Sequence, residues 1–214
     1  MIPELGHFLL IIAAMTALLA PAVVFYGIRR GDDFYAGFSR PASLLTALML
    51  TLSTAALVWA FLTDDFSVAY VANHSNTKLA PAYKAAALWG SHEGSMLLWI
   101  WLMAVGTAGA GFVRCADRLF TARLQGLMLA VLAGFCAFLL FTSNPFLRNL
   151  PMVPPDGRDL NPILQDIGMI LHPPVLFMGY AGLALMFAAM CALLLSGRWS
   201  KTAIDFKTRL SIVN

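Results

Sequence analysis

The sequence predicts an all-α fold, a polytopic bundle of about five transmembrane helices, and two observations carry this prediction. First, 60% of the 214 residues are hydrophobic, only 12% are charged, and the mean hydropathy is +0.77. A water-soluble fold of this size could not cover so much apolar surface. Second, the apolar residues gather in stretches of roughly 20, the length that crosses about 30 Å of hydrocarbon.

The five stretches lie at residues 8–28, 42–62, 95–113, 126–142 and 173–195. We expect each to be a helix, because backbone groups inside a bilayer have no water to bind and must pair within the segment. The N-terminal MIPELGH has no Lys or Arg, and no small-residue cleavage pattern follows the first apolar run. The first stretch is therefore predicted to be a retained span rather than a removable signal peptide. We take residues 1–214 as one transmembrane unit.

Basic residues are distributed unevenly between the connecting segments. Three lie in each of the short loops 29–40 and 114–125, and four lie in the tail after residue 195, which is ten of the fourteen in the chain. With five crossings, all ten lie on one side of the membrane. The positive-inside rule then places the N-terminus outside and the C-terminus in the cytoplasm.

The two outer connections are long, at residues 64–94 and 143–172. They contain turn-forming runs such as SNPF and PPDGRDLNP, so the outer face is predicted to be the working surface. In this topology all four histidines, His7, His74, His92 and His172, lie on the outer side. Neutral imidazole is the commonest metal ligand, so this side is where a metal would bind.

His172 is the first candidate because Pro173 and Pro174 follow it directly. Proline is tolerated in the first turn of a helix, where its missing N–H would have no partner. The last span is therefore predicted to begin at Pro173. His172 would then lie at the outer end of this span, level with the polar interface, where it could hold a metal. The alternative is that His172 is only a polar residue capping the outer end of the helix.

A second candidate is the segment WGSHEGSMLLW. Its residues Trp89, His92, Met96 and Trp99 follow at steps of three, four and three, which predicts one face of a helix entering the membrane. Aromatic rings there could stack on a flat ligand, and Glu93 is a carboxylate that needs a partner near hydrocarbon. The alternative is an aromatic belt, since tryptophan is enriched at membrane interfaces whatever the function.

Three stretches, MIPELGHFLL, WGSHEGSMLLW and DLNPILQDIGMILHPPVLFMGY, resemble the N-terminal part of the CcmF/CycK/NrfE/CcsA family of cytochrome c heme lyases. The resemblance implies a heme-handling protein that helps to join heme b to the CxxCH thiols of apocytochrome c on the periplasmic side. It implies partners as well: heme, a CcmE-like heme carrier, CcmH/CcmI-like subunits and apocytochrome c, with no nucleic acid. It also implies that His172 is an axial ligand of heme iron. Trp89, His92, Glu93 and Trp99 would then line or brace the heme-facing surface.

Members of that family are much longer. They carry a tryptophan-rich segment, a second outer histidine ligand and two intramembrane histidines that hold a further heme, and this sequence has none of these. We therefore expect either a fragment or a chain whose remainder is encoded separately. Alone, it would lack the intramembrane heme and be a poor catalyst, so whether it is an enzyme by itself is left open.

Two other classes of function are weighed against this one. A non-catalytic scaffold would only assemble partner proteins and would not need His172. An ion- or proton-coupled subunit would need ionisable groups at mid-membrane depth, and the five predicted spans contain none. The three cysteines, Cys115, Cys136 and Cys191, show no metal-ligand spacing, and we expect neither a disulfide nor thiol chemistry from them.

Overall fold

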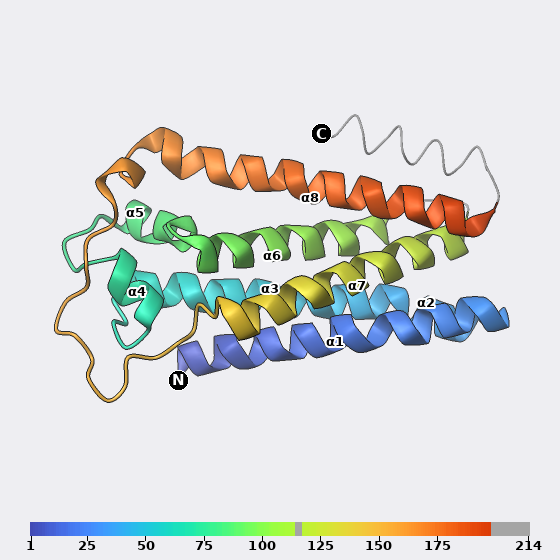
Figure 1. Ribbon diagram of the computed structural model, residues 1–214, viewed down its shortest axis with the longest axis horizontal. Coiled ribbons are helices and arrows are strands. Elements are labelled where there is room, and N and C mark those ends of the chain that lie inside the picture. Colours follow the sequence, from blue (N-terminus) through green and yellow to red (C-terminus); the bar gives the residue numbers. More distant parts are fainter. Residues whose placement is uncertain (114–116, 198–214) are drawn as a thin grey trace.

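The computed structural model describes residues 1–113 and 117–197, and these residues form a bundle of helices. Long helices run side by side along the molecule, and short helices gather mainly at one end (Figure 1). The long helices are α1 (Ile2–Arg30), α3 (Ser39–Leu62), α6 (His92–Ala110), α7 (Arg118–Thr142) and α8 (Ile167–Ser196). The short helices are α2 (Asp33–Gly37), α4 (Ala69–His74) and α5 (Pro81–Ala86), and the 3-10 turns are η1 (Ala87–Trp89) and η2 (Pro162–Leu164).

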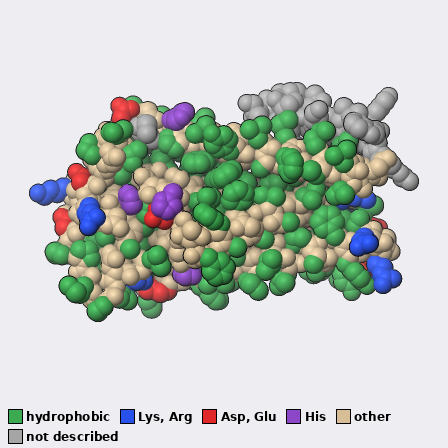
Figure 2. Space-filling model, in the orientation of Figure 1, with side chains coloured by type: hydrophobic (Ala, Val, Ile, Leu, Met, Phe, Trp, Pro, Cys, Tyr) green, Lys and Arg blue, Asp and Glu red, His purple; other side chains and the backbone are tan. Residues whose placement is uncertain are grey.

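The two ends of the bundle differ in chemistry. At one end, which we call the loop end, lie the N-terminus, α4, α5 and the segment 143–166 (Figure 1). The histidine side chains visible in Figure 2 all lie toward this end. At the other, which we call the basic end, lie α2, the end of α6 and the start of α7 (Figure 1). Its arginines in the described part of the chain are Arg29, Arg30, Arg40, Arg118 and Arg123.

Four helical segments of the described chain are long and apolar enough to cross a membrane: Ile2–Arg30, Asp33–Leu62, Arg118–Thr142 and Ile170–Ser196. Large apolar side chains remain exposed along them, for example Leu18 at 60%, Leu48 at 52% and Phe187 at 66%. Such a surface suits lipid rather than water. The predicted helical membrane bundle is therefore confirmed.

The segment 95–113 corresponds to α6, which begins at His92 and ends at Ala110. This helix has 19 residues, and its polar first turn and small residues keep it out of the four candidate spans. It nevertheless lies alongside the other long helices (Figure 1). A fifth crossing, and which end of the bundle faces the cytoplasm, stay predictions.

The prediction that the last helix begins at Pro173 is wrong. α8 begins at Ile167, because the carboxylate of Asp166 accepts a hydrogen bond from the backbone N–H of Gly168 at 2.7 Å and caps the helix. Pro173 and Pro174 lie inside the helix, and His172 lies in its second turn rather than at its mouth. Each proline leaves the carbonyl four residues earlier without its helical partner, so the backbone near His172 carries fewer hydrogen bonds than the rest of α8.

Small and aliphatic residues form the interior of the bundle. On α1, Ala13 and Ala17 are fully buried and allow neighbouring helices to approach closely. Gly27 does the same at the basic end, where a Cβ atom would lie 2.4 Å from the backbone nitrogen of Ala36 in α2. Of the cysteines, Cys136 and Cys191 are free thiols, and Cys115 lies outside the described residues.

Candidate functional site

The two long connections fold against each other across the loop end. The backbone N–H of Ala69 donates to the carbonyl of Leu147 at 2.8 Å, and that of Arg158 donates to the carbonyl of Ala72 at 2.7 Å. These bonds join segments about eighty residues apart into one cap on the bundle. The cap is therefore a fixed platform rather than two independent loops.

Charged side chains strengthen this platform. The guanidinium of Arg148 lies between two carboxylates, 3.4 Å from Glu4 and 3.8 Å from Asp65. Lys84 is buried, and its Nζ atom lies 2.6 Å from the carboxylate of Asp64. Arg148 is thus engaged with the protein's own acids, which the sequence could not reveal because Glu4 is so distant along the chain.

Tyr70 fixes the turn that leads into α6. Its hydroxyl donates to the carbonyl of Leu88 at 2.9 Å and accepts from the backbone N–H of Ser91 at 3.1 Å. Burial raises the pKa of the Tyr70 phenol, so the group stays neutral and can make both bonds. Gly94 allows this close packing, because a Cβ atom there would lie 1.7 Å from the carbonyl oxygen of Leu88.

The structure places Trp89 outside the helix that carries His92, Glu93, Met96 and Trp99. Trp89 belongs to η1. The backbone of Ser91 is extended, with φ −147° and ψ 179°, so the helical conformation is interrupted before α6 begins at His92. The predicted continuous helical face is therefore wrong for Trp89. His92 is the exposed member, and its Nδ1 atom lies 3.4 Å from the carboxylate of Glu93, which is itself mostly buried.

Trp99 lies in the interface between α6, α7 and α8. Its ring packs 4.8 Å from that of Phe135, stacks at 6.3 Å on Phe177 and lies 6.1 Å from Tyr180. Its indole N–H is buried and has no hydrogen-bond partner among the described residues. Trp99 thus supports α8 about a turn and a half below His172. Whether it, Trp89, His92 or Glu93 contacts a ligand stays a prediction.

His172 differs from the other three histidines. His7 lies 3.4 Å from the Asn144 amide, and His74 lies 2.9 Å from the carbonyl of Tyr70. His172 is exposed, and within the described residues it makes no hydrogen bond, ion pair or aromatic contact. Both of its ring nitrogens are therefore available to an external ligand. In residues 1–113 and 117–197, no three His, Cys, Asp or Glu side chains converge on a common metal site.

Taken together, the fold and this site define a helical membrane protein that presents an unengaged imidazole beside a rigid cap. The family model described as Cytochrome C assembly protein matches residues 89–212, more than half of the chain. The chain therefore belongs to the cytochrome c assembly protein family.

Several relatives have known names. The chain is 47% identical over 199 residues to "Cytochrome c-type biogenesis protein CcmF" of Pseudomonas aeruginosa, covering 92% of this chain and 30% of that protein. It is 46% identical over 207 residues to the CcmF of Escherichia coli, covering 96% and 32%. It is 44% identical over 189 residues to "Cytochrome c-type biogenesis protein NrfE" of Haemophilus influenzae, covering 88% and 30%.

A solved structure of "Cytochrome c Heme Lyase CcmF" has the same fold, with a TM-score of 0.85 over 100% of this chain and 33% of that one, at 24% identity. The chain spans about a third of the length of these relatives and corresponds to their N-terminal part.

Proposed function

We propose that this chain is the part of a cytochrome c heme lyase that offers His172 to heme iron as an axial ligand. The observation that carries the proposal is the exposure of His172 without any partner among the described residues, while His7, His74 and His92 are engaged with neighbouring groups. Iron in heme takes a neutral imidazole nitrogen as its axial ligand, and such a nitrogen must not be occupied elsewhere.

The surroundings of His172 fit the flat, largely apolar faces of a porphyrin. On α8, Leu171 is 63% and Val175 is 66% exposed, and Leu176 is also exposed. One turn further, Gly179 has no side chain, and nothing lies within 4 Å of the position a Cβ atom would take. The histidine therefore stands beside an apolar strip with open space next to it. Bound heme b would supply the vinyl groups that become thioether-linked.

The same geometry limits what this chain does alone. It offers one unengaged imidazole, so the second axial ligand comes from outside it, from the remainder of the lyase. The described residues offer no thiol at the site either, since Cys136 is buried and Cys191 lies near the basic end of the bundle. The thiols then belong to the CxxCH segment of apocytochrome c. The role of the chain is then to hold and orient heme. Fixing the reacting groups near each other lowers the activation barrier of thioether formation.

The family and the charge distribution support a proposal for the partners and the location. A CcmE-like carrier would deliver heme to the loop end, and CcmH/CcmI-like subunits would bring the apocytochrome. The basic residues at the opposite end support placing the loop end in the periplasm and the chain in the bacterial inner membrane. A variant without native cysteines that carries H172C tests this, since an impermeant thiol reagent should label it in intact spheroplasts.

Cytochrome c maturation tests the ligand role. Cells without their own lyase receive this chain together with the remainder of the lyase, and covalently bound heme is measured in a reporter cytochrome. H172A should reduce the yield to background, while the matched control H74A, another histidine of the loop end, should preserve it. If H172A supports normal maturation, the chain is a scaffold and the ligand proposal is wrong.

A further inference from the structure

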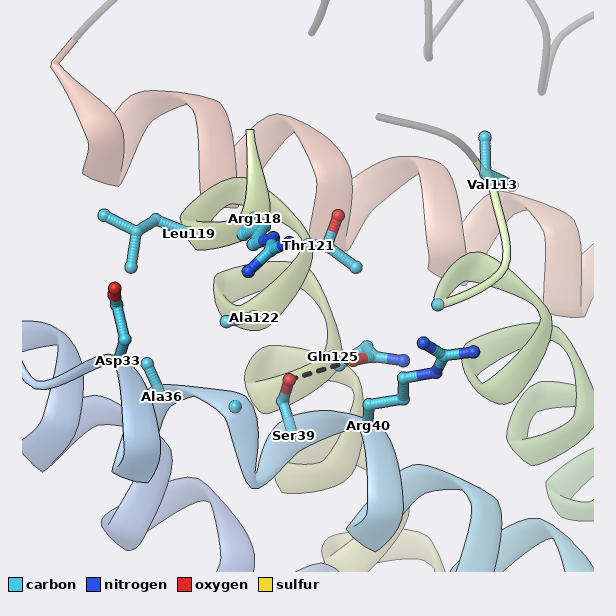
Figure 3. Close-up of a pocket in the computed structure, with 12 residues that line it drawn as sticks. Asp33, Ala36, Ser39, Arg40, Val113, Arg118, Leu119, Thr121, Ala122 and Gln125 are labelled. Carbon is cyan, nitrogen blue, oxygen red and sulfur yellow. Dashed lines mark hydrogen bonds between the residues drawn. The ribbon is translucent and has the colours of Figure 1, made fainter. Parts of the chain in front are cut away.

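A second site lies at the basic end of the bundle, far from His172. A cavity of about 470 Å³ opens between α2, the start of α3, the end of α6 and the first turns of α7. Figure 3 shows Arg40 of α3 and Arg118 of α7 at this cavity, with Gln125 between the helices. Ser39, Thr121 and Asp33 also line it. Both arginines therefore line the same cavity, and they come from different helices.

The floor of the cavity is a fully buried polar network. The amide oxygen of Gln125 accepts a hydrogen bond from Ser39 Oγ at 2.9 Å. Its amide nitrogen donates to Ser43 Oγ at 3.0 Å and to the carbonyl of Thr107 at 3.2 Å. Gly111 makes room for it, because a Cβ atom there would lie 2.7 Å from the amide nitrogen. This network ties α3, α6 and α7 together, so the arginines project from a rigid base.

Within residues 1–113 and 117–197, the arginines at this cavity have no carboxylate partner. The ion pairs of the described residues all lie at the loop end, and none involves Arg40 or Arg118. Arg40 instead lies over the ring of Phe112, 4.8 Å from its centroid. The carboxylate of Asp117 caps α7 by accepting from the N–H of Leu119 at 3.0 Å. Among the described residues that line the cavity, Asp33 is the one acid, so the two arginines leave an excess of positive charge in this lining.

The surroundings indicate a lipid rather than a free ion. The cavity lies at the ends of the candidate spans Asp33–Leu62 and Arg118–Thr142, which is the depth of phospholipid headgroups. Exposed apolar side chains are the chain neighbours of its lining residues, with Phe34 at 72%, Phe38 at 45% and Phe112 at 60%. Acyl chains can cover these rings while the headgroup enters the cavity. Guanidinium groups match the oxygens of a phosphate with paired hydrogen bonds.

We propose that this cavity binds the phosphate of an anionic phospholipid, with Arg40 and Arg118 as its donors. The lipid would fasten α2 and α3 to the first turn of α7, at the end of the bundle opposite the proposed heme ligand. The site does not depend on the role of His172, and either can be wrong without the other.

The test compares the full chain with R40Q/R118Q in nanodiscs of phosphatidylcholine alone and of phosphatidylcholine with phosphatidylglycerol. Native mass spectrometry measures retained phosphatidylglycerol, and thermal unfolding measures the stabilisation. R29Q/R30Q is the matched control, since it removes two arginines from the same end but outside the cavity. Circular dichroism at low temperature checks that each variant is folded.

We expect R40Q/R118Q to retain phosphatidylglycerol at least about tenfold less tightly, because each substitution removes charge-assisted hydrogen bonds to the phosphate. R29Q/R30Q should resemble the unchanged chain, and inorganic phosphate added to phosphatidylcholine discs should not raise the melting temperature. Equal losses in both double variants would show a general charge effect and overturn the proposal. Full stabilisation by inorganic phosphate would also overturn it, in favour of a free-anion site.

Discussion

The carboxylate of Asp166 lies 2.7 Å from the backbone nitrogen of Gly168, and this bond begins α8 before the two prolines. His172 is consequently held by a helical turn on each side of it rather than by the flexible end of a loop. A ligand to iron has to keep its orientation, so this cap is part of the proposed heme site.

Removing the cap should loosen the turn that carries His172. D166A is expected to cost about 1 kcal/mol of local helix stability, because the N–H of Gly168 loses its acceptor. Hydrogen exchange at residues 168–172 should become faster, and heme retention at His172 should fall with it. D166S, which keeps a capping oxygen, is the control. Equal exchange in D166A and the unchanged chain would show that the cap does not hold this turn.

Trp99 provides a test of how α8 is supported. W99F keeps an aromatic ring against Phe135 and Phe177 and removes only an indole N–H that has no partner in the described chain. It should leave thermal stability and heme retention nearly unchanged. W99A should lower stability by about 3 kcal/mol or more, since it leaves a cavity between the three helices. A loss of heme with W99F, at unchanged stability, would instead show that the indole contacts the ligand directly.

The ion pair between the buried Lys84 and the half-buried Asp64 should dominate the stability of the cap. K84M is expected to destabilise the protein by about 3 kcal/mol, because it leaves the Asp64 carboxylate without its counter-ion. The double variant K84M/D64N should recover much of this loss, since no charge is then left unpaired. K78A, which removes a nearby exposed lysine, should have little effect. Thermal unfolding in one detergent compares the four proteins, and a stable K84M would contradict the assignment.

The contact between the two long connections includes the Asp156 carboxylate, so we expect this contact to weaken in acid. The backbone N–H groups of Thr77 and Gly157 donate to its carboxylate and hold the pKa below its ordinary value of 3.8. A lowered pKa means that the contribution to stability is present above pH 3.8 and is lost as the pH falls through the lower, folded value.

The amide resonance of Thr77 should therefore shift with an apparent pKa below 3.8. D156N keeps an acceptor oxygen and should abolish this titration. A midpoint at or above the ordinary value would mean that the contact does not form in solution.

The membrane class and the resemblance to a family were predictable because both depend on patterns of residues close together in the sequence. Apolar runs of the right length and the HPP sequence after His172 need no knowledge of distant contacts. The start of α8 was mispredicted because counting apolar residues overlooks Asp166, whose single capping bond outweighs the preference of proline for a first turn. The one-face arrangement of Trp89 with Trp99 failed because Ser91 takes an extended conformation that spacing cannot reveal.

What the sequence could not show are the long-range partnerships. Arg148 meets Glu4 near the start of the chain, and Gln125 bonds to Ser39, 86 positions away. Nothing near Gln125 in the sequence distinguishes it from a polar residue in a helix. Only the packing of α3, α6 and α7 makes it the floor of a cavity.

Heme titration of the purified chain in detergent, followed by visible absorption, tests the central claim most directly. The unchanged chain should give a weak spectrum of heme with a single histidine ligand. H172A should lose this spectrum, and H92A, the other well-exposed histidine of the loop end, should keep it. Identical spectra from the unchanged chain and H172A would contradict the assignment of His172 as the heme ligand.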